Sequence, residues 1–158
     1  MASAALRLFQ RLGGSAPGRW LFSRLICFRA PYFGSIAPRI DNLEPGTCTV
    51  SIRHRRAVQN HIGTVHAIAL CNMAELAAGL ATDATLPDTQ RWIPKGMSVR
   101  YLRKAVGTMT ATARVPTPDP QADGAELHAI VEVRNAAGED VFDADITMWI
   151  TSRKRAHS

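Results

Sequence analysis

The sequence predicts a single α+β domain in which an antiparallel sheet of about six strands wraps around one long central helix. Three observations support this prediction. The length of 158 residues fits one domain. A long apolar run over residues 65–80 is rich in Ala and Leu and contains no Pro, as expected of a buried helix. Short segments with the pattern of β-strands lie on both sides of that run.

Two short helices are predicted before the sheet. The first carries Leu6, Phe9 and Leu12 on one face and ends at a Gly-Gly break. The second starts near Pro17, a residue that suits the first helical turn, and continues to Pro31. Its apolar side chains repeat at helical intervals and are Trp20, Leu21, Leu25 and Phe28.

Six strands are predicted from apolar and β-branched residues between turn signals. They are expected over residues 35–42, 47–52, 97–101, 108–115, 127–134 and 141–151. A loop bracketed by Pro87 and Pro94 precedes the third of them. We therefore assign residues 1–34 to an N-terminal helical extension, 35–151 to the main domain and 152–158 to a polar tail.

The net charge of +6 is confined to the N-terminus. Residues 1–40 contain six Arg and no acidic residue, whereas residues 41–158 hold 13 basic and 13 acidic side chains. The body therefore lacks the basic excess of a nucleic-acid-binding domain, and no nucleic-acid partner is expected.

The three cysteines, Cys27, Cys48 and Cys71, form no CxxC pattern, so neither a disulfide framework nor a zinc site is expected. No apolar run approaches the roughly 18 residues of a membrane span. We expect a soluble cytoplasmic protein. The mitochondrial matrix is a minor alternative, because the Arg-bearing, acid-free start is similar to a transit peptide.

Glu75 is the only formally charged side chain between Arg56 and Asp83, and it lies in the middle of the apolar helix. A carboxylate removed from water loses solvation, and acids perturbed in this way cluster at functional sites. Glu75 is thus the first candidate for catalysis. The alternatives are that it is solvated in a gap or paired with an Arg such as Arg100.

The segment that enters this helix offers a second candidate. Asn60, Gly63 and Thr64 precede the helix, whose first backbone N–H groups and positive dipole end suit a developing oxyanion. Alternatively, Thr64 simply caps the helix and Asn60 shapes a turn.

Two other polar residues of the helix have different relations to Glu75. His66 is nine residues away and points to the opposite side, so the two cannot form an acid–base dyad within one helix. Asn72 shares a face with Glu75, where it either orients the carboxylate or satisfies a neighbouring polar group. The other histidines, His54, His128 and His157 among them, show no metal-ligand spacing, and no metal centre is expected.

The segment from Asn60 to His66, followed by the helix with Glu75, resembles the hotdog-fold thioesterases of the phenylacetyl-CoA and 4-hydroxybenzoyl-CoA type. In that family an Asn or Gln, then a Gly and a His, precede a helix with an Asp or Glu. The separation of 15 positions between Asn60 and Glu75 matches the family pattern. The resemblance covers residues 36–150. The segments 30–33, 66–70 and 100–102 are similar to a hotdog branch labelled a domain of unknown function.

This resemblance implies a hotdog fold and hydrolysis of acyl-CoA or related thioesters to free acid and CoA, without metal or cofactor. Glu75 would be the general base or the nucleophile, and the backbone N–H of Ala67, next to His66, would bind the thioester oxygen. Asn60 would position water or the carbonyl, and would meet Glu75 across the interface of a homodimer or homotetramer.

The chain departs from the family at Ala67-Ile68, where members commonly have two glycines, so substrate shape or even catalysis is affected. Gly63 and Asn72 are expected at the substrate. A basic cluster is expected to bind the CoA phosphates or to form a solvated face, and comprises Arg91, Lys95, Arg100, Arg103 and Lys104. Within it, Arg103 and Lys104 are the preferred candidates.

Two other functions fit the same residues. A non-catalytic acyl or acyl-CoA binding protein would explain the missing glycines. A hotdog enoyl-CoA hydratase or dehydratase also needs a carboxylate and a His, which would have to come from different subunits.

Overall fold

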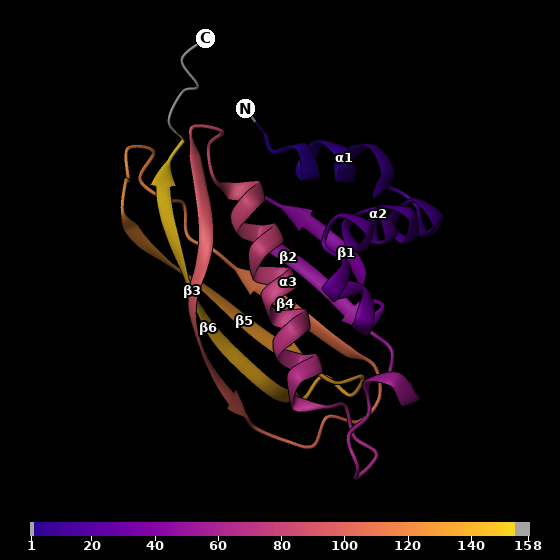
Figure 1. Ribbon diagram of the computed structural model, residues 1–158. Helices are drawn as coiled ribbons and strands as arrows, with labels where there is room; N and C mark the ends of the chain where they lie inside the picture. The colour runs from indigo at the N-terminus through magenta and orange to yellow at the C-terminus, as the bar shows by residue number, and fades with distance from the viewer. Residues whose placement is uncertain (1, 154–158) are drawn as a thin grey trace.

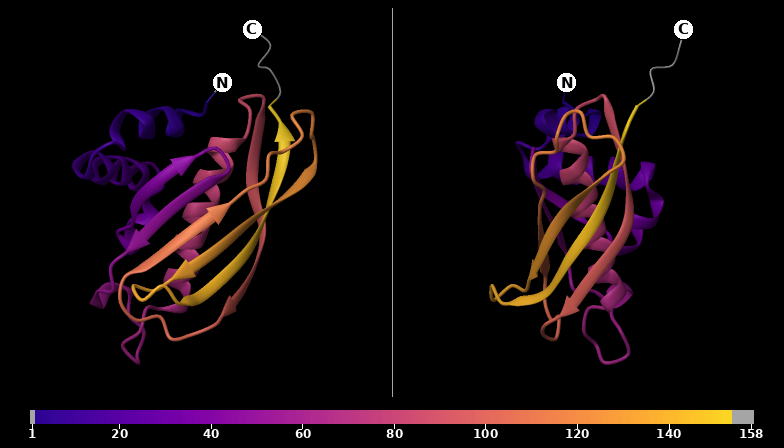
Figure 2. Two further views of the ribbon diagram at one scale, coloured as in Figure 1. Left: turned by 180° about the vertical axis from the view of Figure 1, so that it is seen from behind. Right: turned by 90° about the vertical axis from the view of Figure 1, so that its left-hand side faces the viewer.

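The structure, a computed structural model, describes residues 2–153 and forms one antiparallel sheet curved around a central helix (Figure 1). The six strands are arranged in the order β1-β2-β4-β5-β6-β3. Both N-terminal helices lie beyond the β1 side of the sheet (Figures 1 and 2). This arrangement confirms the predicted α+β architecture. Residues 154–158, which make up most of the predicted polar tail and include His157, lie outside the described residues.

The described elements follow the predicted order, with two strand boundaries corrected. They are α1 (Ala4–Leu12), α2 (Ala16–Arg29), the 3-10 helix η1 (Pro31–Ile36), β1 (Arg39–Glu44), β2 (Thr47–Ile52), the 3-10 helix η2 (Arg56–Val58), α3 (Ala67–Thr85), β3 (Gln90–Tyr101), β4 (Met109–Arg114), β5 (Ala125–Arg134) and β6 (Asp140–Ser152). The first strand does not begin at residue 35, because η1 continues to residue 36. The third begins at residue 90 rather than 97 and includes Pro94, which an edge strand tolerates at an irregularity in its register.

The core lies between α3 and the concave face of the sheet. Most of α3 is buried, and the facing strands β4 and β5 contribute small residues such as Ala111, Ala113 and Ala129. Alanines on both sides let the helix approach the sheet closely, which excludes water from the core. No helix among the described residues is both long enough and apolar enough to cross a membrane.

The N-terminal helices pack onto this core and protect one sheet edge. The rings of Phe9 in α1 and Phe22 in α2 meet edge to face, with centroids 5.1 Å apart, and both are buried. Ser23 of α2 accepts a hydrogen bond from the backbone N–H of Ile40 in β1 at 2.9 Å. At the opposite edge, the only strand that pairs with β3 among the described residues is β6. One edge is therefore covered and the other is open.

Candidate functional site

Two loops meet at the N-terminal end of α3, the loop after β2 and the loop after β3. The backbone N–H of Val65 donates to the carbonyl of Ala105 at 2.8 Å, and that of His66 donates to the carbonyl of Val58 at 2.8 Å. These two bonds hold the helix start between the loop after β2 and the loop after β3. The position of the first helical turn is thus fixed by residues distant in sequence.

His66, rather than Thr64, is the N-cap of α3, which corrects the capping role suggested for Thr64. Its Nδ1 accepts a hydrogen bond from the N–H of Ile68 at 3.0 Å. Its carbonyl accepts from the N–H groups of Ala69 and Leu70 at 2.9 and 3.2 Å. His66 is the N-cap because the backbone is extended at His66 and helical from Ala67 on. Its ring nitrogen then lies within reach of a free N–H group of the first turn.

The backbone N–H of Ala67 is the one donor of this first turn that has no acceptor among the described residues. It stands at the positive end of a helix of 19 residues whose first turn carries no acidic side chain. An open N–H group in this setting can donate to a developing oxyanion.

Asn60 organises its own loop. Its Oδ1 accepts from the N–H groups of Ile62 and Thr64 at 3.1 and 3.0 Å, and its Nδ2 donates to Thr64 Oγ1 at 2.8 Å. Gly63 has a φ of 78°, the left-handed region that favours glycine, and its N–H donates to the Asn60 carbonyl at 3.1 Å. Asn60 therefore shapes a turn, one of the two roles considered for it. One hydrogen of the Asn60 Nδ2 group makes no bond among the described residues.

Glu75 lies half-buried on a stripe of α3 residues spaced four apart, which also contains Cys71, Gly79 and Asp83. No ion pair or hydrogen bond of its carboxylate occurs within residues 2–153. Pairing with Arg100 does not occur, because the Arg100 guanidinium binds both carboxylate oxygens of Asp143 at 2.9 and 2.6 Å. These bonds raise the pKa of Arg100.

Strand β3 runs beside this stripe. At one end the Tyr101 hydroxyl lies 3.5 Å from Cys71 Sγ. At the other end the Trp92 ring covers Gly79 so closely that a Cβ on Gly79 would lie 2.8 Å from Trp92 Cη2. Glu75 therefore occupies the interval between two aromatic side chains of the open edge strand.

Asn72 faces away from this interval. It is buried, and its Nδ2 donates to Ser35 Oγ of η1 at 3.2 Å, whereas its Oδ1 is buried without a partner among the described residues. The described contacts of Asn72 thus link α3 to η1 and not to Glu75.

The expected basic cluster is distributed along β3 and the following loop. Lys95 pairs with Glu126 at 3.2 Å, and Arg91 lies nine residues from Arg100 along a strand, or about 30 Å. Arg103 and Lys104 are exposed and belong to the loop whose Ala105 holds the entrance of α3. Only these last two are therefore near the open Ala67 N–H.

A family model described as a domain of unknown function, DUF4442, matches residues 18–150. The chain belongs to this family. No curated protein sequence matches it.

Solved structures agree with this assignment. The crystal structure of genomics APC5556 is 45% identical, with a TM-score of 0.82 over 94% of this chain and 99% of that chain. The Pseudomonas aeruginosa protein PA5026, a probable thioesterase, is 23% identical, with a TM-score of 0.73 over 83% and 93%. The Haemophilus influenzae thioesterase HI1161 is 13% identical, with a TM-score of 0.72 over 84% and 91%. This DUF4442 domain has the hotdog fold, as the resemblance implied.

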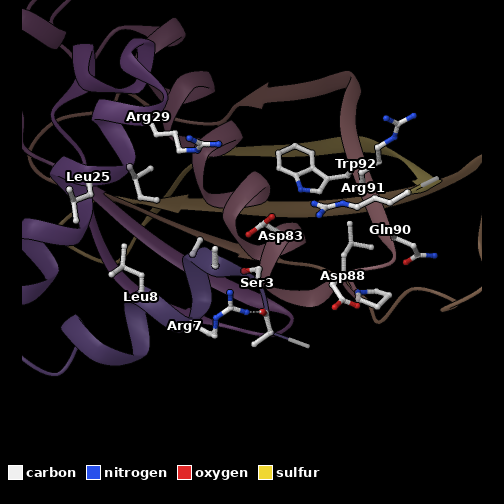
Figure 3. Close-up of a pocket in the computed structure, with 17 residues that line it drawn as sticks. Ser3, Arg7, Leu8, Leu25, Arg29, Asp83, Asp88, Gln90, Arg91 and Trp92 are labelled. Carbon is white, nitrogen blue, oxygen red and sulfur yellow. Dashed lines mark hydrogen bonds between the residues drawn. The ribbon is translucent and has the colours of Figure 1, made fainter. Parts of the chain in front are cut away.

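The DUF4442 domain also has a cavity of about 700 Å³ at the other end of α3, between that helix, α1, α2 and the start of β3 (Figure 3). Leu8, Leu25 and Trp92 contribute apolar wall, and Arg7 and Arg29 contribute positive charge around Asp83. Figure 3 shows Arg29 and Trp92 on one side of Asp83 and Arg7 on the other. This mixed lining suits part of an amphipathic anion.

Three residues that shape the site of this DUF4442 domain were not predicted from the sequence. His54 accepts from the N–H of Gly107 at 3.0 Å through Nδ1, and its Nε2 lies 3.0 Å from the Gly63 carbonyl, so it joins two loops at the helix entrance. Trp92 and Tyr101 flank Glu75. Only Gly79, unusual inside a helix, signalled the close approach of a ring.

Proposed function

We propose that this DUF4442 protein hydrolyses an acyl-CoA or a related thioester to the free acid and the thiol, at a site shared by two copies of the chain. The observation that supports it is that α3 carries both an unpartnered, half-buried carboxylate, on Glu75, and an open backbone N–H, on Ala67 at the helix start. Attack on a thioester carbonyl needs a carboxylate as base or nucleophile and a donor that stabilises the oxyanion.

The two groups of one chain are too far apart to act on the same carbonyl. Eight residues separate them, which corresponds to about 12 Å along the helix axis. The N–H of Ala67 also points away from the helix body, so the oxygen it binds lies farther still from Glu75. Each group must come within roughly 3 Å of the reacting atoms. Glu75 of one copy therefore acts with Ala67 of another.

The open edge of β3 provides the contact for this assembly. It is a strand of 12 residues with β6 as its only described partner, and an edge of this length is a template for pairing. Antiparallel pairing of two β3 strands about a two-fold axis sets the two α3 helices side by side in opposite directions. The start of one helix then approaches the middle of the other, in a homodimer or in a tetramer built from it.

Within that site, Glu75 removes a proton from a water molecule that attacks the carbonyl carbon, or Glu75 attacks that carbon itself and forms an anhydride that water then hydrolyses to the free acid. The Ala67 N–H stabilises the negative oxygen, the C–S bond breaks, and the thiolate leaves. In the copy that supplies the Ala67 N–H, Asn60 holds the loop that leads into α3. Its unused Nδ2 hydrogen can position water. Gly63, in the same loop as Asn60, borders the substrate in this proposal, whereas Asn72 holds α3 against η1 and does not.

The low-identity neighbours support this assignment. Crystal structures of the Staphylococcus aureus thioesterase SAV0944, 19% and 18% identical to this chain, carry either a Gln or a Glu replaced by Ala. Those two positions are 15 residues apart, the separation of Asn60 and Glu75 in this chain.

CoA as the thiol is supported by Arg103 and Lys104, whose exposed charges lie near the helix entrance where its phosphates would be bound. Replacing both by Gln should raise KM for CoA thioesters about tenfold and leave pantetheine thioesters, which lack the nucleotide phosphates, unaffected. The matched control is Arg114→Gln with Arg134→Gln, two exposed arginines on β4 and β5, away from both the helix entrance and the β3 edge.

The test of the proposed function is thiol release from a panel of aromatic and aliphatic acyl-CoAs by wild type and Glu75→Ala. Wild type should release thiol from at least one thioester, and Glu75→Ala should not. Tight binding of acyl-CoA without release would instead identify the binding protein that Ala67-Ile68 suggested. Hydration of an enoyl-CoA without thiol release would identify a hydratase.

A further inference from the structure

The outer face of α2 is unusually apolar. Trp20, Phe28 and Tyr32, just beyond the helix, are 60%, 88% and 71% exposed, and Leu21 and Leu25 are each 42% exposed. Together they make up the aromatic ridge, five large hydrophobic side chains within 13 residues. Patches of this kind on a protein surface mark interaction sites.

The inner face of the same helix is already used. Phe22 is fully buried in the core and Cys27 is buried beside it. A helix that is apolar on both sides is normally covered on both sides, yet within residues 2–153 the large apolar side chains on the outer face of α2 stay exposed. The aromatic ridge therefore needs an occupant from outside the chain.

The position of the ridge separates it from the proposed dimer contact. α2 lies beyond β1, whereas β3 is the strand at the other edge of the sheet (Figure 1). The left view of Figure 2 shows the N-terminal helices on the outside of the molecule. Pairing of two β3 edges would leave the ridge exposed.

The two N-terminal helices carry charge of one sign. Residues 1–40 contain six Arg and no Asp or Glu. Among the described residues, the only one of these arginines in an ion pair with a carboxylate is Arg39, which binds Asp41. Two copies joined through this face would bring together the ten arginines of their α1 and α2 helices, which contain no acidic residue, and this disfavours self-association. An anionic occupant is favoured.

We propose that the aromatic ridge docks the protein on the surface of an anionic phospholipid bilayer. A projecting helix with Trp, Phe and Leu on its outer face and Arg beside them has the composition of an interfacial helix, in which the rings enter the boundary between headgroups and acyl chains. Arg11 of α1 and Arg29 of α2 are exposed and would meet the phosphates. This proposal does not depend on the thioesterase activity.

The experiment is flotation of the full-length protein with phosphatidylcholine vesicles that contain or lack phosphatidylglycerol. Wild type should float with the anionic vesicles only and should be released by high salt. Trp20→Ala with Phe28→Ala should weaken binding at least about tenfold, and Arg11→Gln with Arg29→Gln about tenfold as well. The matched control, Ile62→Ala with Ile130→Ala, removes exposed side chains elsewhere and should bind like wild type.

Three results would overturn the proposal. Wild type that stays unbound with both kinds of vesicle, or binds neutral vesicles equally well, removes the anionic bilayer as occupant. Loss of the dimer in Trp20→Ala with Phe28→Ala, measured by light scattering, would make the ridge a contact between copies. The comparison of wild type on anionic and neutral vesicles needs no variant, so misfolding of a variant would not prevent the test of an anionic bilayer as occupant.

Discussion

The ring nitrogen Nδ1 of His66 accepts a hydrogen bond from the backbone N–H of Ile68 at 3.0 Å and so caps the central helix. Within the described first turn, this bond and those to the His66 carbonyl leave the Ala67 N–H as the one donor that remains open. The residue expected near the thioester oxygen thus also organises the helix start that would bind it.

Replacement of His66 by Ala should lower the free energy of unfolding by about 1 kcal/mol, because the Ile68 N–H loses its acceptor. His66→Asn keeps a capping side chain and should retain most of the stability. Urea unfolding of the three proteins measures the difference. Equal stability of His66→Ala and wild type would show that the cap is dispensable.

Ala67→Pro should remove the oxyanion donor without breaking α3. Ala67 is the first helical residue, where Pro is well tolerated, and the preceding His66 has the extended ψ of 139° that Pro requires. We expect kcat to fall by about 100-fold or more, with stability close to that of wild type. Ala67→Gly is the control that keeps the N–H. A full rate in the Pro variant would exclude this N–H from the reaction.

Gly79→Ala should destabilise the fold by about 1–3 kcal/mol, because the new Cβ would meet the Trp92 ring. In a Trp92→Ala background the same change has room, and Ala favours a helix over Gly by about 1 kcal/mol. The effect of Gly79→Ala should therefore change sign between the two backgrounds in urea unfolding. Additive effects would mean that the ring does not restrict position 79.

The cysteines should differ in reactivity. Burial raises the pKa of the Cys48 thiol strongly and that of Cys27 as well, so at neutral pH both hold less thiolate than a free cysteine. Cys71 is half-exposed, one turn from Glu75. Iodoacetamide at neutral pH should modify Cys71 first, as followed by peptide mass mapping, and Cys71→Ser should show almost no early labelling. Early modification of Cys48 would contradict the described burial.

The sequence predicted the architecture because periodicity and turn residues are local signals. The apolar run around Glu75 identified the central helix, and Leu6 and Phe9 identified a first helix that does bury both side chains. The start of β3 was predicted too late because Pro94 was taken to exclude a strand. A strand tolerates Pro at a sheet edge, and only the assembled sheet shows that β3 is an edge strand.

The candidate site was only partly accessible from sequence. Glu75 and the helix entrance were predicted from their local context, and they stay predictions. The capping role of His66 and the partnership of His54 with Gly107 depend on loops that meet only in three dimensions. The hydrogen bond from Asn72 to Ser35 depends on η1, whose last two residues were expected to begin a strand.

The shared site is tested most directly by mixing two variants that each lack one essential group, Glu75→Gln and Ala67→Pro. Each homodimer should be nearly inactive in thiol release. After denaturation and joint refolding at equal amounts, half of the dimers contain both chains and hold one intact site, so about a quarter of the wild-type rate should return. A mixture that remains as inactive as its parents would contradict a site built from Glu75 of one chain and Ala67 of another.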